Sequence, residues 1–508
     1  MNPTDIRVRF APSPTGPLHI GGVRTALFNY LFAKKHGGTF ILRIEDTDQK
    51  RFVPGAEEYI VESLNWLGIP FDEGVGKEGE YGPYRQSERK DMYAQYAMQL
   101  VESGHAYYTF DTHEEKEAMT ARLQAAKMPP KYDVSSRMSM KNSLTLSEDE
   151  VKLRLERGDE YVIRYKFERN EEIRFHDLIR GWVVFNSNQL DDKVLLKSDG
   201  MPTYHLANIV DDHFMKISHV IRGEEWLPSA PLHVKLYESL GWDRPEFAHL
   251  SLILKPDGKG KLSKRDGDRL GFPVFPINWI DPKTQEMSSG YRESGYIPEA
   301  VVNMLAFLGW HPSDHKELFS LEELVAAFSL ERVSKSGAKF DQDKAKWFNH
   351  QFLMRTSNEE LLSILKPDLE DKHLSKGESY LMSVINMIKE KVSFTHEILS
   401  NANFFFEVPA SYDEKVQRKK WRGDTPSLLQ GYANELIAEN ASSAEEFETV
   451  LESYASAKEI GKGMLMQPLR WAVSGQAGGP PLFDVLSLIG AAEVKNRIDL
   501  AVTNFPAT

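Results

Sequence analysis

The start of the chain, Val8–Gly22, constrains the fold more than any other stretch, and its residues are VRFAPSPTGPLHIGG. An apolar segment at 6–10 runs into two prolines, which end a central strand because proline cannot donate to the ladder. From Gly21 the apolar residues recur at helical spacing, and a second apolar stretch follows at 39–44. The pattern predicts a strand, a tight loop, a helix and a second strand. These open a parallel α/β nucleotide-binding sheet, whose loop lies beside a helix N-terminus that favours phosphate.

Two short motifs resemble the signatures of one enzyme family. The order Ser-Pro-Thr-Gly-x-Leu-His-Ile-Gly-Gly at 13–22 resembles the first signature of class I aminoacyl-tRNA synthetases, and within them the glutamyl branch. KLSKR at 261–265 resembles the second signature of that family. Taken alone, His19 would be an ordinary loop histidine and KLSKR a charged run on a solvated loop. Their combination favours a synthetase, although the family usually has a second histidine where this chain has Gly22.

The resemblance covers most of the chain and implies its organisation. It implies an α/β Rossmann-like catalytic domain with an inserted α+β acceptor-binding domain, followed by an all-α C-terminal half. The expected parts are the first half of the catalytic domain (1–110), the inserted connective domain (111–190), the second half of the catalytic domain (191–255), the KLSKR loop with a stem-contact domain (256–352), and a helical anticodon-binding region of two bundles (353–508).

One segment, Gly271–Gly290, departs from the family pattern and looks inserted beside the KLSKR motif. It could be a lid, an RNA contact or a neutral surface excursion. The KLSKR loop itself is rich in glycine and lysine, a composition that predicts flexibility.

Composition limits the class of protein. The 508 residues contain no cysteine, which excludes disulfides and thiolate chemistry. Some relatives carry a zinc-binding cysteine cluster where this chain has Tyr108 and Phe110, so we expect no zinc. The first residues lack the features of a signal peptide, and no stretch approaches the ~20 apolar residues of a membrane span. We expect a cytoplasmic monomer that does not bind membranes.

The net charge of −13 argues against indiscriminate binding of nucleic acid. It leaves room for an RNA partner that is met by local basic patches. Two stretches are candidates: 415–422, basic with one aromatic residue suited to phosphate and base stacking, and 458–471. The alternative for the first is a solvated helix face. By resemblance the tRNA-binding residues include Lys391, Lys419 and Arg470.

A glutamate pocket must satisfy two carboxylates and one ammonium group. Arg9 and Arg222 are the candidates for the carboxylates, because planar guanidinium matches carboxylate in a bidentate fork. Glu45 would take the ammonium group. Each arginine alone could instead form a surface salt bridge, and the sequence leaves open which arginine meets which carboxylate. The resemblance completes the pocket with Ala11, Ser13, Tyr204, Asn208 and Trp226.

Activation of glutamate by ATP needs positioning and charge stabilisation more than a strong base. By resemblance, His19 would hydrogen-bond phosphate near the reacting centre, Lys264 would balance charge on the departing pyrophosphate, and Glu225 would contact the ribose. Magnesium would accompany ATP on its phosphate oxygens. The implied ATP-binding residues are Pro12, His19, Gly21, Gly22, Glu225, Lys261, Leu262, Ser263, Lys264 and Arg265.

The resemblance implies ATP-dependent ligation of glutamate to tRNA(Glu), with tRNA needed for the activation step. One alternative is a non-discriminating ligase that also charges tRNA(Gln). The glutaminyl branch is disfavoured by the Gly-Gly-x-Arg order at 21–24 and by the helical C-terminal pattern. A catalytically silent RNA-binding protein would have lost the ATP signatures, yet His19 and Lys264 are both present.

Overall fold

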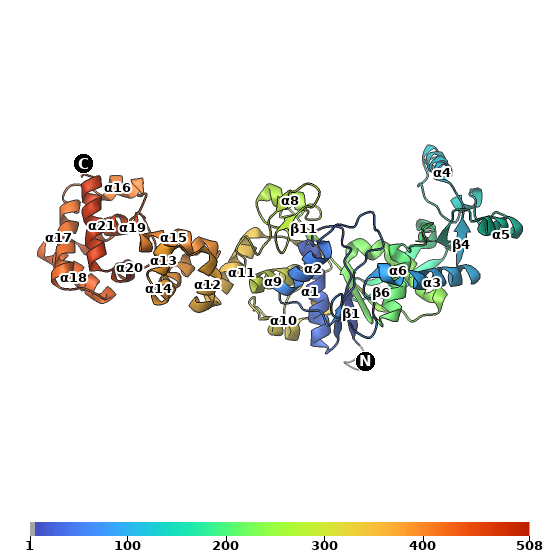
Figure 1. Cartoon of the computed structure of the whole chain (residues 1–508), viewed down its shortest axis with the longest axis horizontal. Coiled ribbons are helices and arrows are strands. Elements are labelled where there is room, and N and C mark those ends of the chain that lie inside the picture. The colour runs from blue at the N-terminus through green and yellow to red at the C-terminus, as the bar shows by residue number, and fades with distance from the viewer. Residues whose placement is uncertain (1–5, 507–508) are drawn as a thin grey trace. The chain divides into compact units, whose positions relative to one another are not determined.

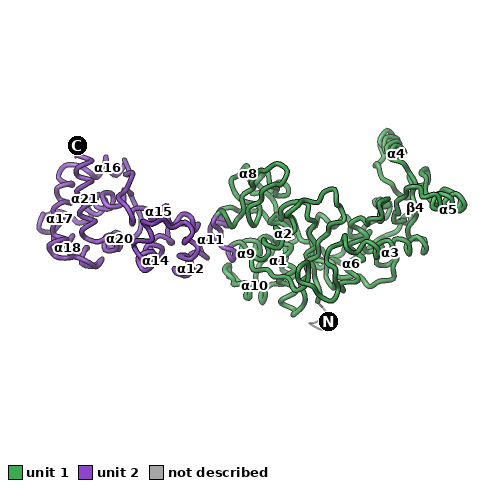
Figure 2. Tube along the Cα trace, viewed as in Figure 1, with its two compact units in different colours: residues 1–294, 301–342 green, residues 295–300, 343–508 purple. Residues whose placement is uncertain are grey.

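The computed structural model describes residues 6–506. The chain divides into two compact units, Met1–Ser294 with Val301–Gln342 and Gly295–Ala300 with Asp343–Thr508 (Figure 2). The described strands all lie in the first unit, whereas the second is helical. None of the helices between residues 6 and 506 combines the length and the apolar character that crossing a bilayer requires.

The predicted opening of the fold is confirmed. Strand β1 (Arg7–Phe10) leads through the loop to helix α1 (Ile20–Lys35) and then to strand β2 (Thr39–Leu42), which pairs with β1 in parallel. Strand β3 (Glu73–Gly74) joins the other edge of β2 in parallel. Beyond Leu42 the chain leaves β2, so the second strand is shorter than the predicted 39–44.

A four-stranded sheet with the order β7-β6-β10-β9 forms the second half of the α/β core. Strands β9, β10 and β6 are parallel, and β7 is antiparallel at the edge. The register of β9 against β10 sets Arg222 opposite His249, which matters for the site described below. The elements of this half are β6 (Glu172–Asp177), β7 (Gly181–Asn186), α6 (Tyr204–Phe214), β9 (His219–Gly223), the 3₁₀ helix η5 (Glu224–Ser229), α7 (Ala230–Leu240) and β10 (Glu246–Leu250).

A third sheet, with the order β4-β5-β8, is antiparallel. It lies next to helices α4 and α5 (Figure 1), but of its three strands only β5 falls within the expected inserted domain, 111–190. Strands β6 and β7 also fall within 111–190, yet they pair with the core strand β10, so this stretch does not form a sheet of its own. The elements are α3 (Lys90–Glu102), β4 (Ala106–Thr109), α4 (His113–Ala125), α5 (Glu148–Arg157), β5 (Val162–Tyr165) and β8 (Val194–Leu196).

The segment 271–290 is not a neutral surface excursion. Phe272, Phe275 and Trp279 are buried, and the Tyr59 hydroxyl of α2 (Ala56–Trp66) donates to the Ile277 carbonyl at 2.5 Å. The Trp279 ring also packs against the Tyr59 ring, with centroids 5.2 Å apart, which anchors the segment on α2. Its tip is a short hairpin of β12 (Trp279–Ile280) and β13 (Met287–Ser288).

The KLSKR motif is more ordered than its composition predicts. Helix α8 (Lys264–Leu270) begins inside the motif, because Ser263 and Asp266 cap it reciprocally. Strand β11 (Ile253–Leu254) precedes the motif and pairs with β14 (Ala338–Lys339). The other helices in this part of the chain are α9 (Pro298–Phe307), α10 (Leu321–Ala327) and α11 (Gln342–Arg355).

The second unit consists of amphipathic helices around apolar cores. Trp471, fully buried, lies in the core of the C-terminal group together with Trp421 and Tyr432. The helices are α12 (Asn358–Leu365), α13 (Asp371–Leu374), α14 (Glu378–Ile388), α15 (His396–Phe406), α16 (Glu414–Lys420), α17 (Thr425–Ala438), α18 (Ala444–Ala457), α19 (Lys462–Ser474), α20 (Leu482–Ile489) and α21 (Ala491–Asn504).

Candidate active site

A cavity of about 550 Å³ opens in the first unit, where the parallel strands β1 and β9 end. The loop after β1, helix α6, the turn after β9 and the segment 252–263 contribute to its walls. The cavity brings together most of the residues expected at the site. The predicted residues that line it are Arg9, Ala11, Pro12, Ser13, His19, Gly21, Gly22, Glu45, Tyr204, Asn208, Arg222, Glu225, Trp226, Lys261, Leu262 and Ser263.

His19 is the N-cap of α1, and its Nδ1 accepts from the Gly21 backbone N–H at 3.1 Å. Burial, with a smaller contribution from Lys261, lowers the pKa of His19 to about 4, so the ring is neutral near pH 7. A neutral ring that accepts at Nδ1 carries its proton on Nε2. Among the described residues this buried Nε2 has no hydrogen-bond partner. His19 therefore offers a free N–H donor beside the cavity.

The glycines after His19 keep the start of α1 close-packed. A Cβ on Gly22 would lie 2.6 Å from the Cδ1 atom of Leu18, so a larger residue there requires the Leu18 side chain to shift. The second histidine that is usual in the family would need a different position for Leu18. The backbone at the helix N-terminus is thereby left open to a ligand.

The KLSKR motif reaches the cavity only through its first half. Lys261 forms an ion pair with Glu225 at 3.0 Å, and both side chains are largely exposed. Lys264 and Arg265 do not line the cavity, because they belong to the first turn of α8. The predicted phosphate lysine thus lies outside the walls described here.

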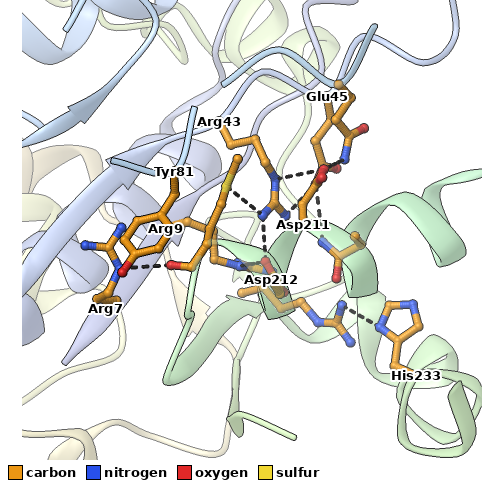
Figure 3. A network of polar contacts seen from close by, with 12 residues as sticks. Arg7, Arg9, Arg43, Glu45, Tyr81, Asp211, Asp212 and His233 are labelled. Atoms are coloured by element: carbon orange, nitrogen blue, oxygen red, sulfur yellow. Dashed lines mark hydrogen bonds and ion pairs between the residues drawn. The ribbon is translucent and has the colours of Figure 1, made fainter. Parts of the chain in front are cut away.

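Arg9 is one of the two predicted carboxylate ligands, and the protein already neutralises it. Its guanidinium donates to both carboxylate oxygens of Asp212, at 3.0 and 3.3 Å (Figure 3). Arg43 donates to the same carboxylate at 2.7 Å and to Glu45 at 3.1 Å. Burial raises the pKa of Glu45 against the opposing effect of Arg43 and Arg9. At Asp212 the two arginines outweigh burial, and the pKa lies below its usual range.

The same cluster continues to the next acidic residue of α6. Asp211 accepts from Arg89 at 2.7 Å and lies 3.8 Å from Arg43. Figure 3 shows Arg9, Arg43, Glu45, Asp211 and Asp212 together in one chain of contacts. The cluster contains three arginines and three carboxylates, so its formal charges balance.

Arg222 differs from Arg9 in its partners. Its guanidinium donates to Tyr204 Oη at 2.8 Å, His249 Nε2 at 3.1 Å, His233 Nδ1 at 3.3 Å and the Trp226 carbonyl at 3.4 Å. Among residues 6–506 no Asp or Glu forms an ion pair with it, although its side chain is only 5% exposed. Arg222 is therefore a buried cation whose charge the protein does not compensate.

Several residues of the site were not predicted from the sequence. Asp211 and Asp212 lie in a helix whose other buried residues, apart from Asn208, are apolar, and this charged pair among apolar residues was a signal for the cluster. His233 and His249 gave no comparable signal. The unpredicted residues that shape the site are Arg24, Arg43, Asp177, Asp211, Asp212, His233 and His249.

The tRNA-binding candidates of the second unit have different environments. Lys391 and Lys419 are exposed, and Arg470 is half-buried, where burial lowers its pKa. The expectation that the aromatic residue of 415–422 stacks on bases is wrong. Trp421 is buried, and its indole N–H donates to the Phe505 carbonyl at 2.7 Å. Only the cations of that stretch are available to a partner.

Searches against known families and proteins agree on one family. Residues 5–347 match the catalytic domain of "tRNA synthetases class I (E and Q)", and residues 353–502 match an "Anticodon binding domain". The glutamate–tRNA ligase of Phocaeicola vulgatus is 55% identical over 505 residues, which cover 99% of each chain. That of Cytophaga hutchinsonii is 55% identical over 502 residues, covering 98% of this chain and 97% of the relative.

Solved structures give the same result. The crystal structure of a glutamate tRNA ligase from Elizabethkingia meningosepticum in complex with its amino acid has a TM-score of 0.96 and 50% identity, covering 99% of this chain and 100% of the other. A glutamate-tRNA synthetase from Elizabethkingia anophelis has a TM-score of 0.91 at 50% identity, covering 98% and 99%. With its two signatures in place around one cavity, the chain belongs to the class I tRNA synthetases of the E and Q group.

Proposed function

We propose that this chain is a glutamate–tRNA ligase. It joins L-glutamate to tRNA(Glu) at the expense of ATP, through a glutamyl-adenylate, and releases AMP and diphosphate. The curated relatives that match it over nearly their whole length are glutamate–tRNA ligases. They give no support to the alternative, a ligase that also charges tRNA(Gln).

The observation that carries the proposal is the uncompensated charge of Arg222. The neighbouring cluster is formally neutral, so it does not compensate the positive charge of Arg222. Arg24, at another part of the cavity wall, donates to the backbone carbonyls of Leu308 and Ser251. Glutamate at neutral pH carries two carboxylates and one ammonium group, a net charge of −1. Glutamine lacks the side-chain carboxylate and carries no net charge, so its binding would leave the positive charge of Arg222 uncompensated. A site of this kind rejects the uncharged analogue strongly.

Other pocket residues support the remaining contacts of glutamate. Glu45 and Asn208, which are hydrogen-bonded to each other at 3.2 Å, form an acidic, polar wall suited to the ammonium group. The rings of Tyr204 and Trp226 lie 4.3 Å apart and cover the side of the pocket next to Arg222. Ala11 and Ser13 would complete the contacts from the loop after β1.

In the activation step, the α-carboxylate of glutamate attacks the α-phosphate of ATP and pyrophosphate leaves. His19 would donate its free Nε2–H to a phosphate oxygen, and the α1 N-terminus at Gly21 and Gly22 would receive the nucleotide. Glu225 would bind the ribose hydroxyls, which requires that it exchange Lys261 for them. Lys264 would act from the rim of the cavity, where a shift of the 261–265 segment would bring it to pyrophosphate.

Magnesium would enter with ATP. Among residues 6–506 no three His, Asp or Glu side chains are grouped as a metal cage. A hard cation bound to phosphate oxygens and water needs no such cage. Its contribution would be to offset the negative charge of the phosphates.

The rest of the chain would serve the tRNA. We propose that 111–190, with helices α4 and α5, holds the acceptor end and that 353–508 reads the anticodon, with Lys391, Lys419 and Arg470 among the contacts. A terminal ribose hydroxyl then attacks the carbonyl carbon of the adenylate, and AMP leaves. The monomeric state, the cytoplasmic location and the need for tRNA in the first step stay predictions from the sequence.

The test is aminoacylation of purified tRNA(Glu) and tRNA(Gln) with labelled glutamate, each with and without ATP. We expect ATP-dependent charging of tRNA(Glu) alone. Charging of both tRNAs would establish the non-discriminating alternative, and charging of neither would favour a silent RNA-binding protein.

Arg222→Ala should raise KM for glutamate about 100-fold or more, since it removes a charged hydrogen-bond partner. Arg51→Ala, an exposed control, should leave it unchanged.

A further inference from the structure

The acceptors around Arg222 are unusual for a buried arginine. Two of them are imidazole nitrogens, one from His249 on β10 and one from His233 on α7. Both histidine side chains are fully buried. Buried guanidinium groups more often pair with carboxylates, as Arg9 does with Asp212 in the same pocket.

The hydrogen bonds fix the tautomer of each histidine. A guanidinium can only donate, so His249 accepts at Nε2 and His233 accepts at Nδ1. The proton of neutral His249 is then on Nδ1, which donates to Asp177 Oδ2 at 2.6 Å. The proton of neutral His233 is on Nε2, 3.3 Å from His205 Nδ1. Asp177 and His205 thus hold the two rings in the tautomers that Arg222 requires.

Both rings are neutral at the pH of the cell. Burial lowers the pKa of His249 to about 4, despite the opposing effect of Asp177. Burial and the charge of Arg222 lower the pKa of His233 well below its usual value. A neutral acceptor orients the guanidinium without cancelling its charge.

The arrangement leaves a defined part of Arg222 available. Within residues 6–506, four of its five N–H groups have acceptors, and one N–H on Nη2 has none. The guanidinium plane is therefore fixed before a ligand arrives, which lowers the entropic cost of binding.

We propose that His233 and His249 are positioning residues that orient Arg222 while leaving its positive charge for a carboxylate of glutamate. They thereby contribute to the preference for glutamate over glutamine. The inference rests on the proposed function, in which Arg222 binds the amino acid. Neither histidine is assigned a direct contact with the substrate or the reacting atoms.

The decisive comparison is His233→Asn against His233→Asp. Both side chains place an oxygen near the position of Nδ1 and leave the same cavity, but only the aspartate neutralises Arg222. We expect His233→Asn to stay within about fivefold of the wild-type KM for glutamate, whereas His233→Asp raises it about 10- to 100-fold. The ratio of kcat/KM for glutamate to that for glutamine should fall in the same proportion. The KM values for ATP and tRNA should not change.

A second pair tests the acceptor itself. His249→Gln keeps an oxygen within reach of the Arg222 Nε–H, and His249→Leu does not. The glutamine variant should keep the KM for glutamate within about fivefold of the wild type. The leucine variant should raise this KM about tenfold or more, with kcat unchanged. Thermal unfolding of all four variants identifies any that fail to fold, and calorimetric titration of L-glutamate measures binding without turnover.

The outcomes separate the inference from the proposed function. If Arg222→Ala leaves KM for glutamate unchanged, the pocket assignment itself is wrong. If Arg222→Ala impairs glutamate binding but the asparagine and aspartate variants of His233 behave alike, the positioning role is overturned. Equal binding by His249→Gln and His249→Leu would also overturn it.

Discussion

The residues of the pocket form two electrostatic classes. Arg9, Arg43 and Arg89 are neutralised by buried carboxylates, whereas Arg222 and Arg24 donate to neutral groups. A buried pair is stable only while both partners are present, because removal of one leaves an uncompensated charge. The first class therefore supports the wall of the pocket, and the second supplies the charge that a substrate can meet.

The neutralised class predicts a pH-dependent effect on stability. Asp212→Asn should lower the free energy of unfolding by about 3–5 kcal/mol near pH 7, because Arg9 and Arg43 would lose their shared carboxylate. The pKa of Asp212 is lower in the folded chain than in the unfolded one. Its contribution is therefore fully present above the unfolded value of about 3.9 and is lost as the pH falls through the folded pKa.

Denaturant unfolding between pH 3 and pH 8 checks this prediction. The difference between the wild type and Asp212→Asn should be largest above about pH 5 and shrink below about pH 4. Asp48→Asn, at an exposed pair with Arg51, should change stability by no more than about 1 kcal/mol. A difference for Asp212→Asn that grew as the pH fell would contradict the charge assignment.

The sequence predicted which arginines line the pocket, but it did not predict the residues that form hydrogen bonds and ion pairs with them. Arg9 and Arg222 follow from local motifs at strand ends, which a reader of the sequence can place at one edge of a sheet. Asp212 lies 203 residues from Arg9, and His249 lies 27 residues from Arg222. These partners depend on how α6 and β10 pack in the folded chain, and no local pattern gives their register.

At the scale of elements, the structure also differs from the sequence-based expectation, both in the KLSKR motif and in the segment that follows it. The composition predicted a flexible loop, but the Ser-x-x-Asp spacing at 263–266 is a helix-capping signal that starts α8. The segment 271–290 departed from the expected pattern and proved to be anchored. The Val274 carbonyl accepts from the Ile20 N–H at 3.0 Å, so the segment supports the first turn of α1 beside the proposed ATP site.

This packing predicts a strong effect at Gly290. A Cβ there would lie 2.1 Å from the Ile277 backbone, so Gly290→Ala should destabilise the first unit by about 1–3 kcal/mol. It should also raise KM for ATP more than KM for glutamate, because the displaced segment includes Val274, whose carbonyl accepts from the first residue of α1. Gly463→Ala is the control, since a Cβ there meets nothing within 4 Å and lies in a helix, where alanine is favoured. Differential scanning calorimetry and initial rates measure both effects, and unchanged values for Gly290→Ala would refute the anchoring role.

At the scale of the whole molecule, a chain of net charge −13 must bind a polyanion through local surfaces. In the second unit α16 presents Lys415, Lys419 and Lys420 as exposed cations, and Trp421, which follows the helix, is buried in the core. Such a surface can contact phosphates but cannot stack on bases. Its contribution to tRNA binding should therefore be electrostatic and sensitive to salt.

Lys419→Gln tests this assignment. We expect KM for tRNA to rise at 150 mM salt, with no change in KM for glutamate or ATP, because the helix does not belong to the active site. The slope of the logarithm of tRNA affinity against the logarithm of salt concentration should fall by about one, as for the loss of one phosphate contact. Lys376→Gln removes an equally exposed charge from the same unit and should leave the slope unchanged. If both variants lowered the slope equally, the cation would act through overall charge alone, and α16 would have no specific place in the tRNA interface.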